Sequence, residues 1–197
     1  MATIFEDDFN SYTENENLHG QGSWSGDASY KVQDDVVKEG TNAVENGSTV
    51  NDREIFKTGT ARNDGRITVY MRRSSVSSGR AYLFLYEDTT LVGFFMFRDD
   101  YFKAIFDSGW DTFGTVVANQ WHEVEIEWRS SDHNIRYRVD GGDWQGWGLA
   151  ANTWSTGLDR VGFAVYGQAS GQYSYWDYIA EEPLPPSVDT GNFFNLF

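Results

Sequence analysis

Three glutamates alternate along the segment WHEVEIEW at residues 121–128: Glu123, Glu125 and Glu127. Paired carboxylates can hydrolyse glycosidic bonds when they lie about 5 to 5.5 Å apart, one as nucleophile and one as acid. On a strand, Glu123 and Glu127 have Cα atoms about 13 Å apart, so they would have to converge across a concave sheet. A half-buried strand produces the same alternation without catalysis. We favour a solvated sheet face, and therefore a protein that is not an enzyme.

A second set of residues has the chemistry of sugar binding. Exposed indole rings stack on sugar rings, while nearby amides and carboxylates hydrogen-bond the hydroxyl groups. The residues of this set, which fall in turn-rich stretches, are Trp110, Trp144, Trp147, Trp154, Asp143 and Gln145. The alternative is that each indole covers an end of the fold. The sequence leaves both interpretations open.

Carboxylates near both ends of the chain offer oxygen ligands for calcium. Asp7 and Asp8 lie in the first predicted strand and Asp177 in the last, so they approach each other if these strands pair. The spacing of a calcium-binding loop is absent, so the sequence leaves a calcium cofactor open. The three histidines are scattered without a zinc-binding motif, and we expect them to be solvated.

The composition indicates a folded, acidic protein. Aromatic residues make up 17% of the 197 residues, the net charge is −15 and cysteine is absent. Such a charge repels nucleic acid and anionic membranes, so neither is expected as a partner. The N-terminus lacks the features of a signal peptide, and no segment approaches the roughly 20 apolar residues of a membrane span. We expect synthesis in the cytoplasm.

Alternation with a period of two dominates the sequence and predicts an all-β protein. The predicted strands are Ile4 to Phe9, Tyr30 to Val37, Ala43 to Glu45, Arg53 to Phe56, Arg66 to Arg72, Arg80 to Tyr86, Leu91 to Arg98, Phe102 to Phe106, His122 to Trp128, Ile135 to Val139, Arg160 to Tyr166 and Tyr173 to Ala180. Their number and spacing favour an antiparallel two-sheet jelly-roll sandwich. Both faces of the strand at 80–86 are apolar or aromatic, which predicts a central position.

Proline residues end the predicted domain, which spans residues 1–182, and residues 183–197 form a tail. The tail carries an apolar group at its end, consisting of Phe193, Phe194, Leu196 and Phe197. One interpretation is that this group folds back onto the sandwich. The other is that it docks into a protein partner or a second copy of the chain.

Several segments together resemble the laminin G-like members of the concanavalin A-like jelly rolls. They are IFEDDFNSY at 4–12 with GQGSW at 20–24, WHEVEIEW at 121–128 with IRYRVDGGDW at 135–144, and YSYWDYIAEE at 173–182. The resemblance implies a jelly roll whose strand at 121–128 is structural, and it keeps calcium open. The same superfamily includes family 16 glycoside hydrolases, whose active strand carries glutamate, aspartate and glutamate at alternate positions. Glu125 departs from that pattern, which weighs against hydrolysis.

The chain also resembles proteins of bacteriophage particles in its opening, its closing segment and its acidic, cysteine-free composition. This resemblance implies a non-catalytic module on a virion surface, anchored by the tail and able to bind glycans. A free carbohydrate-binding protein is the alternative, and a glycoside hydrolase that uses Glu123 and Glu127 is the third hypothesis.

Overall fold

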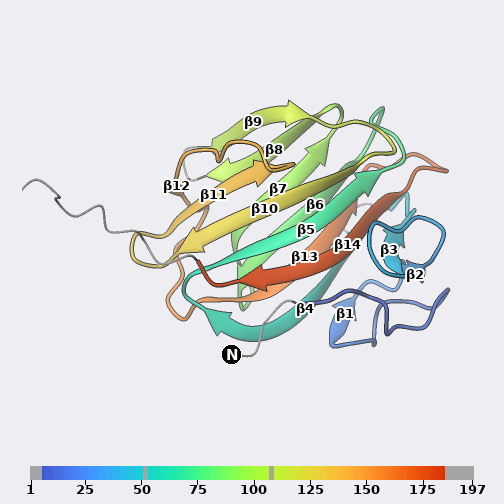
Figure 1. The fold of residues 1–197 in the computed structure, drawn as a ribbon, viewed down its shortest axis with the longest axis horizontal. Coiled ribbons are helices and arrows are strands. Elements are labelled where there is room, and N and C mark those ends of the chain that lie inside the picture. Colours follow the sequence, from blue (N-terminus) through green and yellow to red (C-terminus); the bar gives the residue numbers. More distant parts are fainter. Residues whose placement is uncertain (1–5, 51–52, 107–108, 185–197) are drawn as a thin grey trace, which may run out of the picture.

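The computed structural model describes residues 6–50, 53–106 and 109–184, which form fourteen strands and no helix (Figure 1). The strands are β1 (Trp24–Gly26), β2 (Lys31–Gln33), β3 (Ala43–Asn46), β4 (Arg53–Arg62), β5 (Gly65–Arg73), β6 (Arg80–Glu87), β7 (Thr90–Arg98), β8 (Tyr101–Phe106), β9 (Gly109–Thr115), β10 (Trp121–Arg129), β11 (Asn134–Val139), β12 (Gly148–Leu149), β13 (Leu158–Tyr166) and β14 (Ser174–Glu182). Within these residues, nothing resembles a helix that could span a membrane.

The strands form two antiparallel sheets of seven strands each. Sheet A has the order β12-β11-β10-β5-β14-β3-β2, and sheet B has the order β1-β4-β13-β6-β7-β8-β9. The two sheets pack face to face (Figure 1), which confirms the predicted all-β jelly-roll sandwich. Strand β6 is the fourth of the seven strands in sheet B, so its predicted central position is also confirmed.

Alternating side chains fill the space between the sheets. In β5 every second residue is buried, which is the pattern of a strand with one face in the core. Phe163 of β13 links two buried indoles, with ring centroids 5.0 Å from Trp24 and 5.1 Å from Trp176. Each buried aromatic side chain contributes about 1.5 to 3 kcal/mol by leaving water. This aromatic core stabilises a chain that has no disulfide.

The predicted strands agree with the structure except near the ends and in glycine-rich stretches. The predicted strand at residues 4–9 is reduced, in its described part, to a single bridge between Asp7 and Ile179. Strands β1, β9 and β12 were not predicted. The turn after β11 contains Asp140 and Gly141, which both have positive φ angles, 53° and 66°. A turn with positive φ angles at both central residues has a backbone twist that matches the right-handed twist of the segments it joins.

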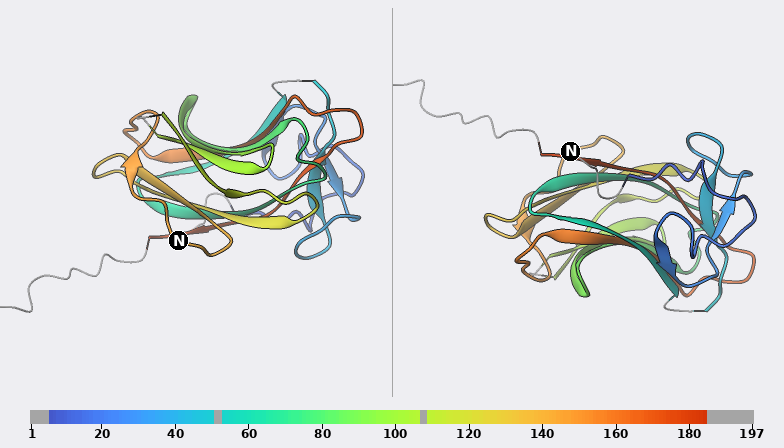
Figure 2. Two further views of the ribbon diagram at one scale, coloured as in Figure 1. Left: turned by 90° about the horizontal axis from the view of Figure 1, so that it is seen from above. Right: turned by 90° about the horizontal axis from the view of Figure 1, so that it is seen from below.

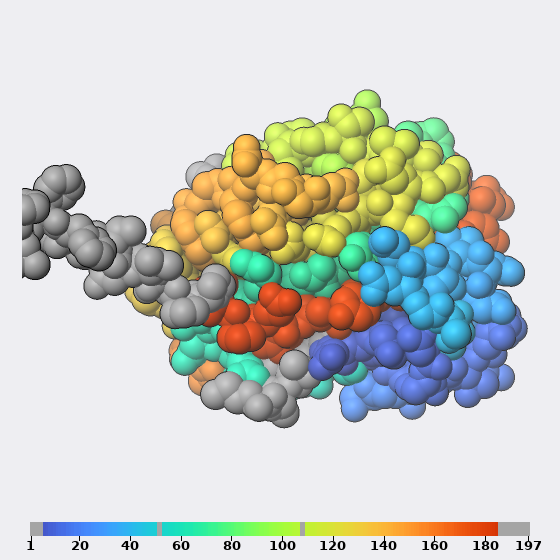
Figure 3. Space-filling view, viewed as in Figure 1, coloured from blue at the N-terminus to red at the C-terminus, as the bar shows by residue number. Residues whose placement is uncertain are grey.

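Sheet B curves so that its outer face is concave (Figure 2). No segment of the described chain forms a third layer on this face, in contrast to the face of sheet A, which carries the long segment after β11 (Figure 3). Residues 185–197, which include Phe193, Phe194, Leu196 and Phe197, lie outside the described residues. Docking through this apolar group therefore stays a prediction.

Candidate functional site

A groove lined by aromatic side chains lies on the concave face of sheet B. The cavity has a volume of 310 Å³. Its aromatic lining residues are Tyr82 and Phe84 from β6, Phe94 from β7, Trp110 from β9 and Tyr166 from β13. Five aromatic side chains in one groove, from four strands, make it the best candidate for a ligand-binding surface in the described structure.

The strand register places large residues beside small ones and so creates the hollow. Tyr82 lies opposite Ala164, and Phe84 lies opposite Gly162, on the neighbouring strand β13. The inward-facing residues of β6 fill the core, so Tyr82 and Phe84 must point outward from the sheet. The small residues on β13 leave the sides of these rings uncovered. The groove therefore follows from alternation in β6 combined with small residues in β13.

The rings of the groove form a continuous row. Tyr82 and Phe84 stack with centroids 5.2 Å apart and an interplanar angle of 15°. Phe94 packs edge-on against Phe84 at 5.6 Å and against Trp110 at 4.7 Å. Trp110, at one end of the row, is 47% exposed, and Tyr166, which also lines the groove, is 38% exposed. The row offers flat apolar faces to a ligand, and its contacts hold each ring in place.

Glu54 of β4 is the one carboxylate that lines the groove among the described residues. Tyr86 donates a hydrogen bond to Glu54 Oε1 at 2.7 Å. Burial raises the pKa of Glu54, while the bond from Tyr86 and the charge of Arg160 lower it. Hydrolysis by the two-carboxylate mechanism needs a second acid. The groove is therefore equipped to bind a ligand and to fix its orientation.

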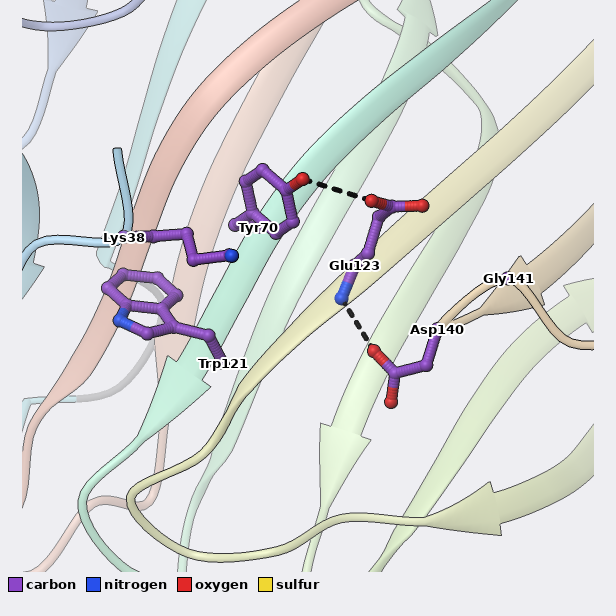
Figure 4. Close-up of a pocket in the computed structure, with 6 residues that line it drawn as sticks. All are labelled: Lys38, Tyr70, Trp121, Glu123, Asp140 and Gly141. Carbon is purple, nitrogen blue, oxygen red and sulfur yellow. Dashed lines mark hydrogen bonds between the residues drawn. The ribbon is translucent and has the colours of Figure 1, made fainter. Parts of the chain in front are cut away.

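A second cavity of 340 Å³ opens on sheet A (Figure 4), lined by Lys38, Tyr70, Trp121, Glu123, Asp140 and Gly141. Tyr70 donates a hydrogen bond to Glu123 Oε2 at 3.0 Å, and burial together with this bond raises the pKa of Tyr70. The Lys38 ammonium lies 4.8 Å from the centroid of the Tyr70 ring and covers it. Only Trp121 then offers a ring face to a ligand in this cavity. It is the weaker candidate for stacking.

Glu125 and Glu127 are not on a solvated face, contrary to the prediction, because their carboxylates are 5% and 0% exposed. Arg66 donates from Nε to Glu127 at 2.8 Å, and Arg138 donates from Nη2 to Glu125 at 2.7 Å. Arg136 binds the other oxygen of Glu127. We call these five residues the ion-pair ladder. Its carboxylates are held by guanidinium groups, which is a structural role.

Trp144 and Trp147 cover the ion-pair ladder and are partly exposed, so sugar binding by these two residues stays a prediction. The Trp144 ring lies 4.5 Å from the guanidinium carbon of Arg136 and 4.6 Å from that of Arg138. Trp147 lies 4.5 Å from the same carbon of Arg136. Figure 3 shows the segment after β11, in orange, lying over the outer face of β10 and β11. The rings exclude water from the charges beneath and gain cation–π contacts.

The other predicted sugar-binding residues divide between different parts of the molecule. Trp110 lies in the groove of sheet B. Trp154 is 3% exposed and packs edge-on against His133 at 5.0 Å, so the prediction that it binds sugar is wrong. Asp143 is exposed, and Gln145 is held by its backbone bond to Tyr137. These two residues follow β11 beside the ion-pair ladder, on the opposite sheet from Trp110. The predicted set is therefore not one site.

His122 is buried, contrary to the expectation that the histidines are solvated. It is 2% exposed, and its Nε2 atom accepts a hydrogen bond from the backbone N–H of Val117 at 3.2 Å. The proton of the neutral ring must then lie on Nδ1, which donates to Asp140 Oδ2 at 2.7 Å. His122 thereby fixes the turn after β11 from inside the sandwich.

The structure does not assemble Asp7, Asp8 and Asp177 into a calcium site. The carboxylate of Asp7 accepts hydrogen bonds from Tyr12 and Trp24 and pairs with Lys57 at 2.7 Å. These donors occupy the oxygens that a cation would need. Asp8 is exposed and caps the backbone of Asn10. Within the described ranges, no group of three or more His, Cys, Asp or Glu residues could hold a metal ion.

Asp177 is fully buried, and one of its oxygens has no hydrogen-bond partner. Its Oδ2 atom accepts from the backbone N–H groups of Lys38 and Glu39 at 2.7 and 3.0 Å, while Oδ1 has none in the structure. Burial raises the pKa of Asp177 to about 6. An acid whose folded pKa is raised favours its neutral form in the folded state. Its contribution to stability is complete below about pH 4 and is lost as the pH rises through about 6.

We therefore expect that Asp177→Asn changes the pH dependence of folding. A rise of about two pK units corresponds to about 3 kcal/mol, which the wild type loses between pH 4 and pH 8 relative to the variant. Urea unfolding of both proteins at pH 4 and pH 8, with and without calcium, measures this difference. Equal pH dependence in the two proteins would contradict the shifted pKa. Stabilisation of the wild type, but not of the variant, by calcium would instead indicate that Asp177 binds calcium.

Comparison with known proteins identifies relatives by structure alone. No protein-family model and no curated protein matches the sequence. A sialidase structure is similar with a TM-score of 0.72 and 13% identity over 92% of this chain, which spans 18% of that protein. The catalytic domain of a glycoside hydrolase family 131 protein from Coprinopsis cinerea has a TM-score of 0.63 and 10% identity, and 93% of this chain covers 96% of that one.

A β-glucanase from Bacillus licheniformis is also similar, with a TM-score of 0.56 and 13% identity over 91% of this chain and 97% of that one. These neighbours are jelly-roll sandwich proteins of the concanavalin A-like fold. At such low identity, the similarity establishes the fold of this chain and leaves its activity open.

Proposed function

We propose that this protein is a non-catalytic carbohydrate-binding module whose binding surface is the groove on the concave face of sheet B. The observation that carries the proposal is the row of aromatic rings from Tyr82 to Trp110, in which each ring packs against a neighbour and Trp110 is 47% exposed. Sugar rings present apolar C–H faces that pack on such rings, while their hydroxyl groups need polar partners. Glu54, which lines the groove and accepts a hydrogen bond from Tyr86, supplies such a partner.

The three neighbours support carbohydrate as the ligand class, since their names are those of a sialidase, a glycoside hydrolase and a β-glucanase. Absence of catalysis is part of the proposal. It rests on Glu54 as the one carboxylate that the described residues place in the groove, and on the structural role of the ion-pair ladder.

Affinity electrophoresis of the full chain through gels that contain different polysaccharides tests the proposal. We expect retardation in at least one polysaccharide, together with no release of reducing ends during long incubation with the same polymer. Release of reducing ends that is lost in Glu123→Gln would support the hydrolase hypothesis instead. Migration that is unaffected by every polysaccharide would contradict sugar binding.

Display on a larger assembly, such as a virion, is a further part of the proposal that rests on the sequence of residues 183–197. Its apolar group would anchor the module while the groove binds glycans independently. We expect the full chain to form larger particles than a chain that ends at Glu182, and light scattering of both measures this. Identical monomers would remove the anchoring role and leave the groove unaffected.

A further inference from the structure

We infer that the ligand of the groove is an anionic glycan, one that carries carboxylate or sulfate groups. This inference deepens the proposed function and rests on it. The argument starts from the charges around the groove, which are opposite in sign to those of the protein as a whole. The chain has 30 acidic and 15 basic residues, a net charge of −15. The concave face departs from this balance.

Among the described strand residues that face outward around the groove, four are cationic and one is a carboxylate. They are Arg80, Arg98, Lys103 and Arg160 against Glu54, as the register of β4, β13, β6, β7 and β8 places them. Charges farther away than about 8 to 10 Å are largely screened at physiological salt. Arg98 pairs with Asp99 at 3.4 Å and Arg160 pairs with Asp88 at 3.8 Å, so Arg80 and Lys103 are the cations of this set whose charge a ligand in the groove experiences most strongly.

Two of the cations are held in place by aromatic rings. The guanidinium carbon of Arg80 lies 5.4 Å from the Tyr166 ring, and the Lys103 ammonium lies 5.4 Å from the Trp110 ring. Within the described residues, no carboxylate forms an ion pair with Arg80 or Lys103. These contacts fix each cation beside a ring on which a sugar can stack. Apart from the hydrogen bond between Arg80 and Tyr82, their donors can bind an anionic group of the ligand.

The arginines at one end of the groove add an independent observation. Arg80 and Arg98 lie directly opposite each other on β6 and β7. Like charges at directly opposed positions destabilise a sheet. Asp99 relieves part of this repulsion through its ion pair with Arg98 at 3.4 Å, and both of these side chains are partly exposed. An anionic group of the ligand that lies between the two guanidinium groups would relieve the rest.

The test compares anionic polysaccharides with neutral counterparts of the same backbone. Polygalacturonate and hyaluronan are used with their carboxyl-reduced forms, and carrageenan, a sulfated galactan, is used with its desulfated form. We expect the full chain to bind at least one anionic polymer at least tenfold more tightly than its counterpart. Comparison of the carboxylated polymers with the sulfated polymer also shows whether carboxylate or sulfate is the group that is bound. Equal affinity for an anionic polymer and its neutral form would overturn the inference.

Single substitutions identify the cations that bind the anionic groups of the polymer. Arg80→Gln and Lys103→Gln should each weaken binding of the anionic polymer about tenfold, and should weaken binding of its neutral form less than that. Lys38→Gln is the matched control, since it makes the same charge change at the second cavity. Loss of binding in Lys38→Gln alone would overturn the inference by moving the site to sheet A.

The outcomes separate this inference from the proposed function. Anionic and neutral glycans that bind equally well, and whose binding responds equally to Arg80→Gln and Lys103→Gln, overturn the charge preference and keep the groove as a sugar site. Binding of no glycan at all overturns both.

Discussion

Trp110→Ala is expected to weaken glycan binding by about 2 kcal/mol, or roughly 30-fold in Kd. Trp110 is the most exposed ring of the groove, at 47%, and Phe94 packs edge-on against it at 4.7 Å. Its loss removes the largest flat surface for a sugar ring while the core stays intact. Isothermal titration of the polysaccharide that is most strongly retarded in gels measures the change.

Trp121→Ala is the matched control for this prediction. Trp121 lines the second cavity on sheet A, so its removal changes the same residue type without touching the groove. Glycan binding by Trp121→Ala should equal that of the wild type, and both variants should keep the unfolding temperature of the wild type within a few degrees. If Trp121→Ala lost binding and Trp110→Ala kept it, the second cavity would be the binding site.

Glu127→Ala is expected to destabilise the protein by about 3 to 5 kcal/mol. The Glu127 carboxylate is fully buried between Arg66 and Arg136, and Trp144 lies over both guanidinium groups. Removal of the carboxylate takes away the ion-pair partner of Arg136 and leaves Arg66 with its longer contacts to Glu125 and Glu182, at 3.8 and 3.7 Å. Urea unfolding measures the loss, which corresponds to a fall in Tm of roughly 10 °C.

Glu123→Ala provides the comparison within the same strand. Glu123 accepts one hydrogen bond, from Tyr70, and is partly exposed, so its removal should cost about 1 kcal/mol. Glycan binding should be unchanged in both variants once they are folded. Equal stability of Glu127→Ala and Glu123→Ala would show that the ion-pair ladder does not stabilise the sandwich.

The strands were predictable because their side chains alternate. Strand β6 shows both the success and its limit. The sequence indicates that Tyr82, Phe84 and Tyr86 form one face of a central strand, and apolar residues on both faces suggest burial on both sides. In the structure the central position is correct, but the aromatic face is open and forms the groove. Local pattern cannot distinguish a covered aromatic face from an exposed one, because the covering layer comes from elsewhere in the chain.

The ion-pair ladder could not be predicted from the sequence, for a related reason. The alternation of Glu125 and Glu127 correctly places them on the outer face of β10. Their burial depends on partners from β5 and β11 and on Trp144 and Trp147 from the segment after β11. The register between strands brings these residues together. Arginine at alternate positions of β11, opposite the glutamates, is the one signal in the sequence that could have indicated the pairing.

Mapping of the bound glycan by NMR tests the central claim most directly. Amide chemical shifts of the full chain are recorded while the polysaccharide that binds in gels, cut to short oligosaccharides, is added. The account predicts that the largest changes fall in β6, β7, β9 and β13, around Tyr82, Trp110 and Tyr166. Changes confined to β5, β10 and the turn at Asp140 would place the sugar in the second cavity and contradict a binding groove on the concave face.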